Sequence, residues 1–250
     1  MALLWRKTCE DTDYEVRSAG RTRRLYTNGV FHSQYSPARP WTHGVWDLLM
    51  LPALFHSPGE IQRVLVLGVG GGAVIRLLQS HIRPREIIGI DLNPVHLSVA
   101  RRFFGVRTSS AELIPADACH WLANYRGPPF DLIIEDLFGD ADGQPRRAVP
   151  LDAGWCALLK RHLSRRGTLV VNTLGQGELR RSTLCTRWRT ARGFRRAWRL
   201  DLPVYDNVVG AFLRVDAERH TLYKALEALP RTPGRKLDFR LRRLALPERG

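Results

Sequence analysis

The sequence predicts an α/β protein built on a doubly wound, mostly parallel sheet, with an antiparallel pair of strands at one edge and a small N-terminal β-hairpin cap. Three observations predict this class. An apolar run, Val64–Leu67, enters a glycine-rich turn and then a helix, as buried parallel strands do. Strand-like and helix-like segments then alternate with short connections. Near the C-terminus, two strand-like segments are separated by Asp201–Pro203 alone.

Residues 1–58 are expected to form the cap and a linking helix. The stretch 14–35 alternates in polarity and contains two turn signals, Ala19-Gly20 and Asn28-Gly29. Asn-Gly favours a type I′ hairpin because both central residues of that turn take positive φ. Gly44–Phe55 carries its apolar residues at helical spacing, which predicts a partly buried helix.

Residues 59–230 are expected to form the sheet domain. The predicted strands, in chain order, span 64–67, 86–91, 112–116, 130–136, 168–173, 194–200 and 204–215. The predicted helices span 73–79, 94–104, 118–125, 151–163 and 217–229. The remaining residues, 231–250, are rich in arginine and proline and are expected to be a loosely ordered basic tail.

Composition bounds the location and the partners. The formal net charge is +15, and almost all of the positive charge is arginine. Such a charge suits nucleic acid, but no zinc-finger, RNP or KH signature accompanies it, so nucleic acid is not expected as a partner. No apolar run reaches the length of a membrane span, no signal peptide is recognisable, and the four cysteines are scattered. These features predict a reduced, cytoplasmic protein without membrane contact.

The glycine-rich turn and two acids after it are the first candidates for a binding site. Gly68, Gly70 and Gly72 allow positive φ and a close approach to a nucleotide, although strand-to-helix turns that bind nothing use the same residues. Asp91, at the carboxyl end of the second sheet strand, is placed for the ribose hydroxyls of an adenosine. Asp117, after the third strand, suits an exocyclic amine, and its neighbour Ala118 suits a backbone contact. Each acid also fits as the N-cap of the next helix, so both interpretations stay open.

A second group of candidates lies after the fourth strand and in the cap. Asp136 closes an apolar strand and could orient or deprotonate an attacking amine. Asp140 and Asp142 follow in a loop that suits a cationic substrate, or they serve as turn formers. His32 and His43 could close over the pocket from the cap or be structural. No Ser-His-Asp order, paired metal ligands or Walker lysine appears, so no metal is expected.

On these residues the chain resembles the spermidine synthase family, the polyamine aminopropyltransferases, within the Rossmann-like class I S-adenosylmethionine-dependent methyltransferase fold. The likeness runs from about Tyr14 to Val215. The segments that carry it are Asn28–Phe31, Val64–Gly72, Ile90–Pro94, Ala116–Ala118, Phe130–Asp136 and Leu159–Asn172.

The resemblance implies a group donor, either S-adenosylmethionine or its decarboxylated form, and a small-molecule amine as acceptor. The residues implied in donor binding are Gly68, Gly70, Gly72, Asp91, Leu92, Asp117 and Ala118. Among them, Asp91 would contact the ribose and Asp117 the adenine. Asp136 would be the catalytic acid beside the attacking amine.

The sequence also departs from the family pattern. Gly71 stands where family members have an aspartate that holds the ammonium of the decarboxylated donor. Asp140 comes one position late in the acidic loop, His32 replaces a glutamine, and His43 lies in Thr-His-Gly where the family has Tyr-His-Glu. These last three residues are the predicted substrate-side contacts. The pattern resembles the divergent bacterial spermidine-synthase-like branch, whose glycine turn also lacks the aspartate.

Three functions fit these features. The one we predict is aminopropyl transfer from decarboxylated S-adenosylmethionine to an amine such as putrescine. The alternatives are methyl transfer from S-adenosylmethionine to a small molecule and a catalytically degenerate module that binds an adenosyl ligand. Retention of Asp91, Asp117 and Asp136 together argues against the third. The exposed edges of the hairpin cap suit pairing in a homodimer.

Overall fold

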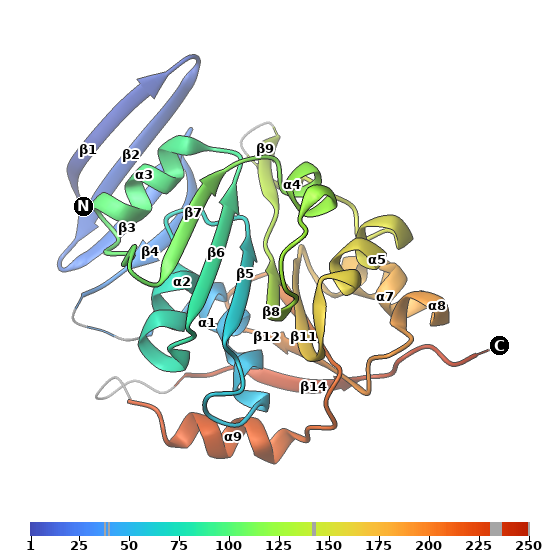
Figure 1. Cartoon of the computed structure of the whole chain (residues 1–250). Coiled ribbons are helices and arrows are strands. Elements are labelled where there is room, and N and C mark those ends of the chain that lie inside the picture. Colours follow the sequence, from blue (N-terminus) through green and yellow to red (C-terminus); the bar gives the residue numbers. More distant parts are fainter. Residues whose placement is uncertain (38, 40, 142–143, 231–236, 250) are drawn as a thin grey trace.

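The computed structural model describes residues 1–37, 39, 41–141, 144–230 and 237–249. Within these residues, a small antiparallel sheet at the N-terminus stands beside a larger mixed sheet that is covered by helices on both faces (Figure 1). The predicted fold class is confirmed. No helix among the described residues combines the length and the apolar character needed to cross a membrane.

The cap is a four-stranded antiparallel sheet in the order β1-β2-β3-β4. Its strands are β1 (Ala2–Cys9), β2 (Thr12–Ala19), β3 (Thr22–Thr27) and β4 (Val30–Tyr35). Asn28 and Gly29 have φ values of 47° and 78°, as the predicted type I′ turn requires. Val16 and Leu25 are fully buried and pack with Val99, which places the cap against the helix that follows the second strand of the large sheet.

The linking segment is helical but changes type in the middle. Helix α1 (Val45–Met50) runs directly into a 3₁₀ helix, η1 (Leu51–Phe55), where one continuous helix was predicted. Pro52 lies in the first turn of η1, and a proline interrupts the regular hydrogen-bond ladder of an α-helix. Every residue of both pieces is buried.

The large sheet has the order β14-β12-β13-β11-β8-β5-β6-β7. Its strands are β5 (Arg63–Leu67), β6 (Glu86–Asp91), β7 (Ala111–Pro115), β8 (Phe130–Glu135), β11 (Leu163–Thr173), β12 (Arg196–Asp201), β13 (Val208–Leu213) and β14 (Arg240–Leu244). The strands from β11 through β7 are parallel, whereas β13, β12 and β14 pair antiparallel at one edge. The predicted antiparallel edge pair is thus present.

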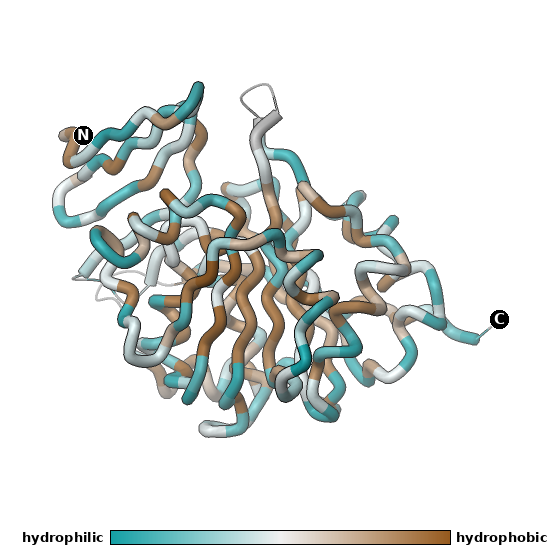
Figure 2. Tube along the Cα trace, turned by 45° about the horizontal axis from the view of Figure 1, so that its top comes forward, coloured by the Kyte–Doolittle hydropathy of each residue, from teal (hydrophilic) through white to brown (hydrophobic). Residues whose placement is uncertain are grey.

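Helices cover both faces of this sheet. They are α2 (Ala73–Leu77), the π-helical turn η2 (Leu78–Ile82), α3 (Pro94–Arg102), α4 (Ala118–Asn124), α5 (Ala153–Arg161), α6 (Gln176–Arg181), α7 (Thr183–Thr186), α8 (Trp188–Ala191) and α9 (Arg219–Glu227). Successive residues of β5 point to opposite faces, so Val64 and Val66 join the core under α1, α2 and α9, while Leu65 and Leu67 join the core under α4 and α5. Figure 2 shows the apolar strands that separate these two cores.

After residue 135, strands that were not predicted occur in two regions. In the tail that was expected to be loosely ordered, Arg240–Leu244 form β14, which adds an edge strand by pairing with β12. The acidic loop after the fourth strand forms a hairpin of β9 (Phe138–Ala141) and β10 (Gln144–Arg147). Both segments mix arginines or acids with few apolar residues, and edge strands of this kind give a weak apolar signal.

Candidate active site

A cavity of about 780 Å³ opens at the carboxyl ends of β5, β6 and β8. The cap contributes Tyr14, Phe31 and His32 to its wall, and the β9–β10 hairpin contributes Phe138 and Pro145. In open parallel sheets, ligands bind at this edge. The cavity therefore lies where the predicted site residues were expected to meet.

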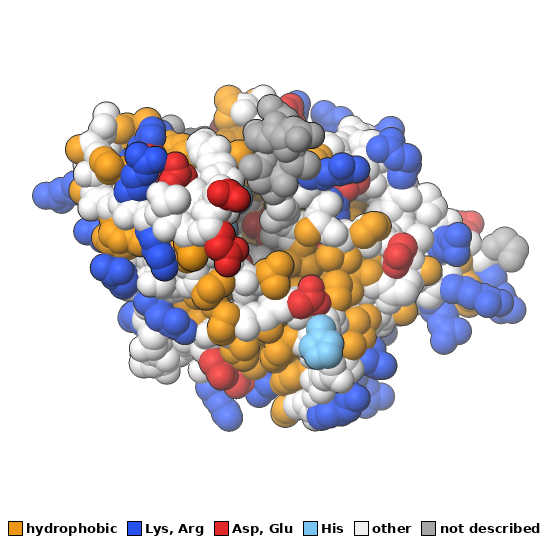
Figure 3. All heavy atoms as spheres, turned by 90° about the horizontal axis from the view of Figure 1, so that it is seen from above, with side chains coloured by type: hydrophobic (Ala, Val, Ile, Leu, Met, Phe, Trp, Pro, Cys, Tyr) orange, Lys and Arg blue, Asp and Glu red, His pale blue; other side chains and the backbone are white. Residues whose placement is uncertain are grey.

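The charged side chains that line this cavity are all acidic. They are Glu10, Asp91, Asp117 and Asp136, and no lysine or arginine is among the described lining residues. Seen from above, acidic side chains surround the hollow, while Lys and Arg lie mainly toward the outline of the molecule (Figure 3). A protein of formal charge +15 thus has a site that favours cations.

Asp91 shapes the glycine-rich turn. One carboxylate oxygen, Oδ2, accepts hydrogen bonds from the backbone N–H groups of Val69 and Gly70 at 2.9 and 2.8 Å. The other, Oδ1, accepts from Asn93 N at 2.8 Å. Burial raises the pKa of Asp91, but the nearby imidazole of His96 and these backbone donors outweigh it and bring the pKa below its usual value. Asp91 is therefore ionised where the predicted ribose contact would be made.

Of the two acids that follow strands, Asp117 is the N-cap of the next helix and Asp91 is not. Asn93, and not Asp91, caps α3 by accepting from the N–H of Val95. Asp117 does cap α4, because its Oδ1 accepts from His120 N at 2.7 Å. The side chain of Asp117 is nevertheless exposed and lines the cavity, so the predicted adenine contact remains sterically open.

Leu92 and Ala118, the other two predicted neighbours of the donor, also line the cavity. Leu92 is 74% exposed, so its side chain is accessible at the cavity. Ala118 is buried. Both therefore lie at the cavity in which the adenosyl group is predicted to bind.

Contacts from the cap reach the residues around Asp91. Thr27 Oγ1 lies 2.9 Å from His96 Nε2, and His96 Nδ1 lies 3.7 Å from Asp91 Oδ1. Asn93 Nδ2 donates to the Tyr14 hydroxyl at 2.8 Å. Sequence reasoning missed Thr27, His96 and Tyr14 because these pairs join segments far apart in the chain, and no local pattern indicates them.

Asp136 lies between β8 and the hairpin, partly exposed in the cavity. Its backbone N–H donates to Leu67 O, and its Oδ1 accepts from Asn172 Nδ2 at 2.8 Å. Asn207 in turn donates to Asn172 Oδ1 at 3.3 Å. Burial raises the pKa of Asp136 to about 6, against the opposing effects of Asn172 and of the positive charge of Arg147. A carboxylate with this pKa can take up and release a proton near neutrality.

Gly71 does not face the cavity. A Cβ at this position would lie 2.8 Å from Ser33 Cβ and 2.9 Å from the ring of Phe104, so the cap and the segment after α3 fill the space that a side chain would need. Gly72 is likewise absent from the described lining, whereas Gly68 and Gly70 form part of it. The turn thus presents backbone, and no acid, to a donor.

The predicted substrate-side residues are not brought together. His32 lines the cavity, with its ring 5.1 Å from that of His96. His43 is not among the described lining residues, and its backbone N–H donates to the buried Asp47. Asp140 belongs to β9, but its side chain lies outside the described part of the structure, as does all of Asp142. No group of His, Cys, Asp or Glu suited to a metal ion occurs among the described residues.

Comparison with known sequences points to one group of enzymes. No family model matches the chain. It is 32% identical over 109 residues to polyamine aminopropyltransferase 2 of Caldanaerobacter subterraneus subsp. tengcongensis, covering 42% of this chain and 36% of that protein. It is 28% identical over 113 residues to the polyamine aminopropyltransferase of Chromobacterium violaceum, covering 44% and 42%. The matched segment spans less than half of either relative.

Comparison with solved structures shows the fold. A probable spermidine synthase from Corynebacterium glutamicum matches with a TM-score of 0.68 at 16% identity, covering 91% of this chain and 88% of that one. A spermidine synthase in complex with the transition state analogue AdoDATO matches with 0.65 at 13%, covering 88% and 75%. Human methyltransferase-like protein 13 in complex with SAH matches with 0.60 at 18%, covering 75% and 94%. The predicted resemblance to the polyamine aminopropyltransferases, on a methyltransferase-type fold, is confirmed.

Proposed function

We propose that this protein is a spermidine-synthase-like transferase that moves an aminopropyl group from decarboxylated S-adenosylmethionine to an amine acceptor such as putrescine. The observation that carries the proposal is the cavity itself, whose charged lining residues, among those described, are four carboxylates in a protein of charge +15. The donor is a sulfonium that also bears an ammonium group, and a diamine is a dication near neutral pH. An acidic site suits both reactants.

In this proposal the donor lies against the glycine turn. Asp91 and Asp117 would accept hydrogen bonds from the ribose hydroxyls and the adenine amine, and Leu92 and Ala118 would flank the base. Because Asp91 is already bound to Val69 and Gly70 through Oδ2, the ribose would share its Oδ1 edge with Asn93. One carboxylate would then link the shape of the turn to the bound donor.

Asp136 would act on the acceptor. One ammonium of the bound diamine would first lose its proton, which Asp136 can accept because its pKa is raised to about 6. The resulting neutral amine would attack the methylene carbon beside the sulfonium, a C–N bond would form as the C–S bond breaks, and the electron pair would leave with the thioether sulfur. The product nitrogen would remain protonated as a secondary ammonium. Phe31 and Trp46 line the cavity and would exclude water from the reacting atoms.

Methyl transfer is the second candidate, and Gly71 is the observation that favours it. The position offers no carboxylate for the ammonium of a decarboxylated donor, and Ser33 and Phe104 leave no room for one. S-adenosylmethionine carries a carboxylate of its own, which an acid at this position would repel. The same cavity would then hold S-adenosylmethionine and a nucleophile beside Asp136.

The test is calorimetric titration of the protein with each donor, followed by mass analysis of the products after putrescine is added. Aminopropyl transfer predicts binding of the decarboxylated donor and a product enlarged by an aminopropyl group. Asp136→Asn should keep donor binding and lose about 10²-fold or more in kcat. Asp238→Asn, an exposed acid outside the cavity lining, is the matched control and should behave as the wild type. Tight binding of S-adenosylmethionine with none of its decarboxylated form would refute aminopropyl transfer.

A further inference from the structure

Arg147 is a buried arginine at the end of the hairpin that closes one side of the cavity. It is the last residue of β10, and its side chain is 5% exposed. It is not among the described residues that line the cavity, so it does not offer its charge to a ligand. Burying a guanidinium is costly unless its N–H groups have hydrogen-bond partners, so a buried arginine must be paired.

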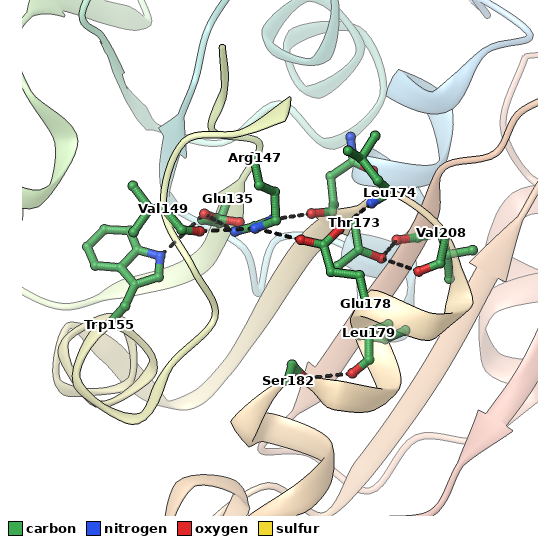
Figure 4. Close-up of polar contacts among 12 residues, drawn as sticks. Glu135, Arg147, Val149, Trp155, Thr173, Leu174, Glu178, Leu179, Ser182 and Val208 are labelled. Carbon is green, nitrogen blue, oxygen red and sulfur yellow. Dashed lines mark hydrogen bonds and ion pairs between the residues drawn. The ribbon is translucent and has the colours of Figure 1, made fainter. Parts of the chain in front are cut away.

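Those contacts join four separate segments (Figure 4). Arg147 Nη2 lies 2.5 Å from Glu135 Oε1 at the end of β8, and Nε donates to Val149 O at 3.0 Å. Nη1 donates to the backbone carbonyl of Asn172 at the end of β11. Nε also lies 3.5 Å from Glu178 in α6. A single guanidinium thus holds the hairpin against two parallel strands and the helix after them.

The two strand ends that Arg147 holds are the ones that place Asp136. Glu135 precedes Asp136 in the chain, and Asn172 donates from its side chain to Asp136 Oδ1. Arg147 therefore fixes the neighbour of Asp136 along the backbone and, through a carbonyl, its hydrogen-bond partner. Without Arg147, Glu135 and Asn172 would each lose a contact that holds them in place in the absence of a ligand.

Resting on the proposed function, we propose that Arg147 is a positioning residue for the transfer reaction, which sets the orientation of Asp136 through Glu135 and Asn172.

The cost of the arrangement supports this assignment. Glu135 is fully buried, accepts from Trp155 Nε1 at 3.3 Å as well as from Arg147, and has a second oxygen, Oε2, without a hydrogen-bond partner among the described residues. Burial raises the pKa of Glu135, and Arg147 opposes that rise. An apolar pair of similar volume would hold a hairpin at less cost, so the charges specify geometry more than they add stability. The positive charge of Arg147 also lowers the pKa of Asp136.

The test uses opposite perturbations of one pair. Glu135→Gln leaves Glu178 as the one described carboxylate beside Arg147, so the positive charge of Arg147 is less compensated. This should lower the pKa of Asp136 and move the acid limb of the kcat/KM profile to lower pH. Arg147→Met removes the charge and should move that limb to higher pH. We expect shifts of about 0.5 pH unit or more in each direction. An acid limb that stays in place in both variants would show that this pair does not act on Asp136.

Arg147→Lys separates charge from geometry. The ammonium keeps the charge but cannot reach Glu135, Val149 and Asn172 together, so kcat should fall about tenfold or more while the dissociation constant of the donor stays within about twofold. Arg146→Met is the matched control, because this exposed neighbour on β10 makes no side-chain hydrogen bond or ion pair with a described residue. A loss of kcat in Arg147→Lys no larger than in Arg146→Met would overturn the proposal.

A measurement without substrate keeps this inference apart from the proposed function. Carbon-13 NMR of labelled aspartate side chains gives the titration midpoint of Asp136, whose signal is identified by its absence in Asp136→Asn. Opposite shifts of that midpoint in Glu135→Gln and Arg147→Met support the coupling even if no acceptor is turned over. Unchanged midpoints overturn it, whereas failure of the wild type to transfer an aminopropyl group refutes the proposed function alone. If Arg147→Met does not fold, Glu135→Gln and Arg147→Lys decide.

Discussion

Substitution of Gly68 by alanine tests the closest backbone approach in the site. Gly68 has a φ of +86°, and a Cβ there would lie 2.1 Å from the carbonyl oxygen of Asp136. Ordinary contact begins at 3.4 Å, so the glycine turn or the start of the hairpin must move by about 1.3 Å. The neighbouring atom is backbone, and no side-chain rotamer can relieve the overlap. Because the turn and Asp136 move together, donor binding and catalysis should both suffer.

A matched glycine separates the two costs of this substitution. Gly59 has nearly the same φ, +84°, with nothing within 4 Å of the position that a methyl group would take, so Gly59→Ala reports the backbone strain alone, about 1 kcal/mol. Gly68→Ala adds the displacement and should cost about 3 to 4 kcal/mol in the free energy of unfolding measured with urea. Its affinity for the donor, measured by calorimetry, should fall about tenfold or more. Equal losses of stability in both variants, with unchanged donor affinity in Gly68→Ala, would refute the close approach.

Two further substitutions test buried acids. Asp47 is fully buried and accepts hydrogen bonds from the backbone N–H groups of Thr42 and His43. Burial raises the pKa of Asp47 to about 6, above its value in the unfolded chain. The free energy of unfolding should therefore fall as the pH rises from about 4 past 6 and Asp47 ionises. Asp47→Asn lacks this titration. The loss in free energy of unfolding that it causes relative to wild type, measured with urea, should be about 2 kcal/mol smaller at about pH 7.5 than at about pH 4.5. Equal losses at the two pH values would contradict the raised pKa. Asp91→Asn should lose about 2 kcal/mol of stability without any ligand, because in either orientation the amide nitrogen would face a backbone N–H, that of Gly70 or that of Asn93. Full stability of this variant in thermal unfolding would limit Asp91 to ligand contact.

The parts of the fold that were predictable carry strong local signals. The apolar run Glu86–Asp91 between short connections is β6 with the predicted bounds, because a strand buried on both faces needs consecutive apolar residues. Asn28-Gly29 forms the predicted turn because few other pairs tolerate its dihedral angles. The edge strand Arg240–Leu244 was not predictable, since its sequence, Arg-Leu-Arg-Arg-Leu, leaves little apolar pattern to detect.

The candidate site was predictable at strand ends and not across segments. Asp91 and Asp136 follow apolar strands, and parallel topology brings their positions to one edge. The roles of Asn172 and Arg147 depend on contacts between residues far apart in the chain, and neither lies in a recognisable motif. In the sequence, Gly71 indicates only a missing carboxylate. The packing of Ser33 and Phe104 adds that the chain has closed the space such a carboxylate would occupy.

The opposite signs of the cavity and of the surface around it have a kinetic consequence. A cationic ligand that diffuses toward a molecule of charge +15 first meets a repulsive long-range field, and only near the mouth does it meet the attraction of Glu10, Asp91, Asp117 and Asp136. Salt screens the distant field before the near one, since the Debye length is about 10 Å at 0.1 M ionic strength and about 30 Å at 0.01 M. The capture rate of such a ligand should therefore rise as salt is first added, which is the reverse of ordinary electrostatic steering.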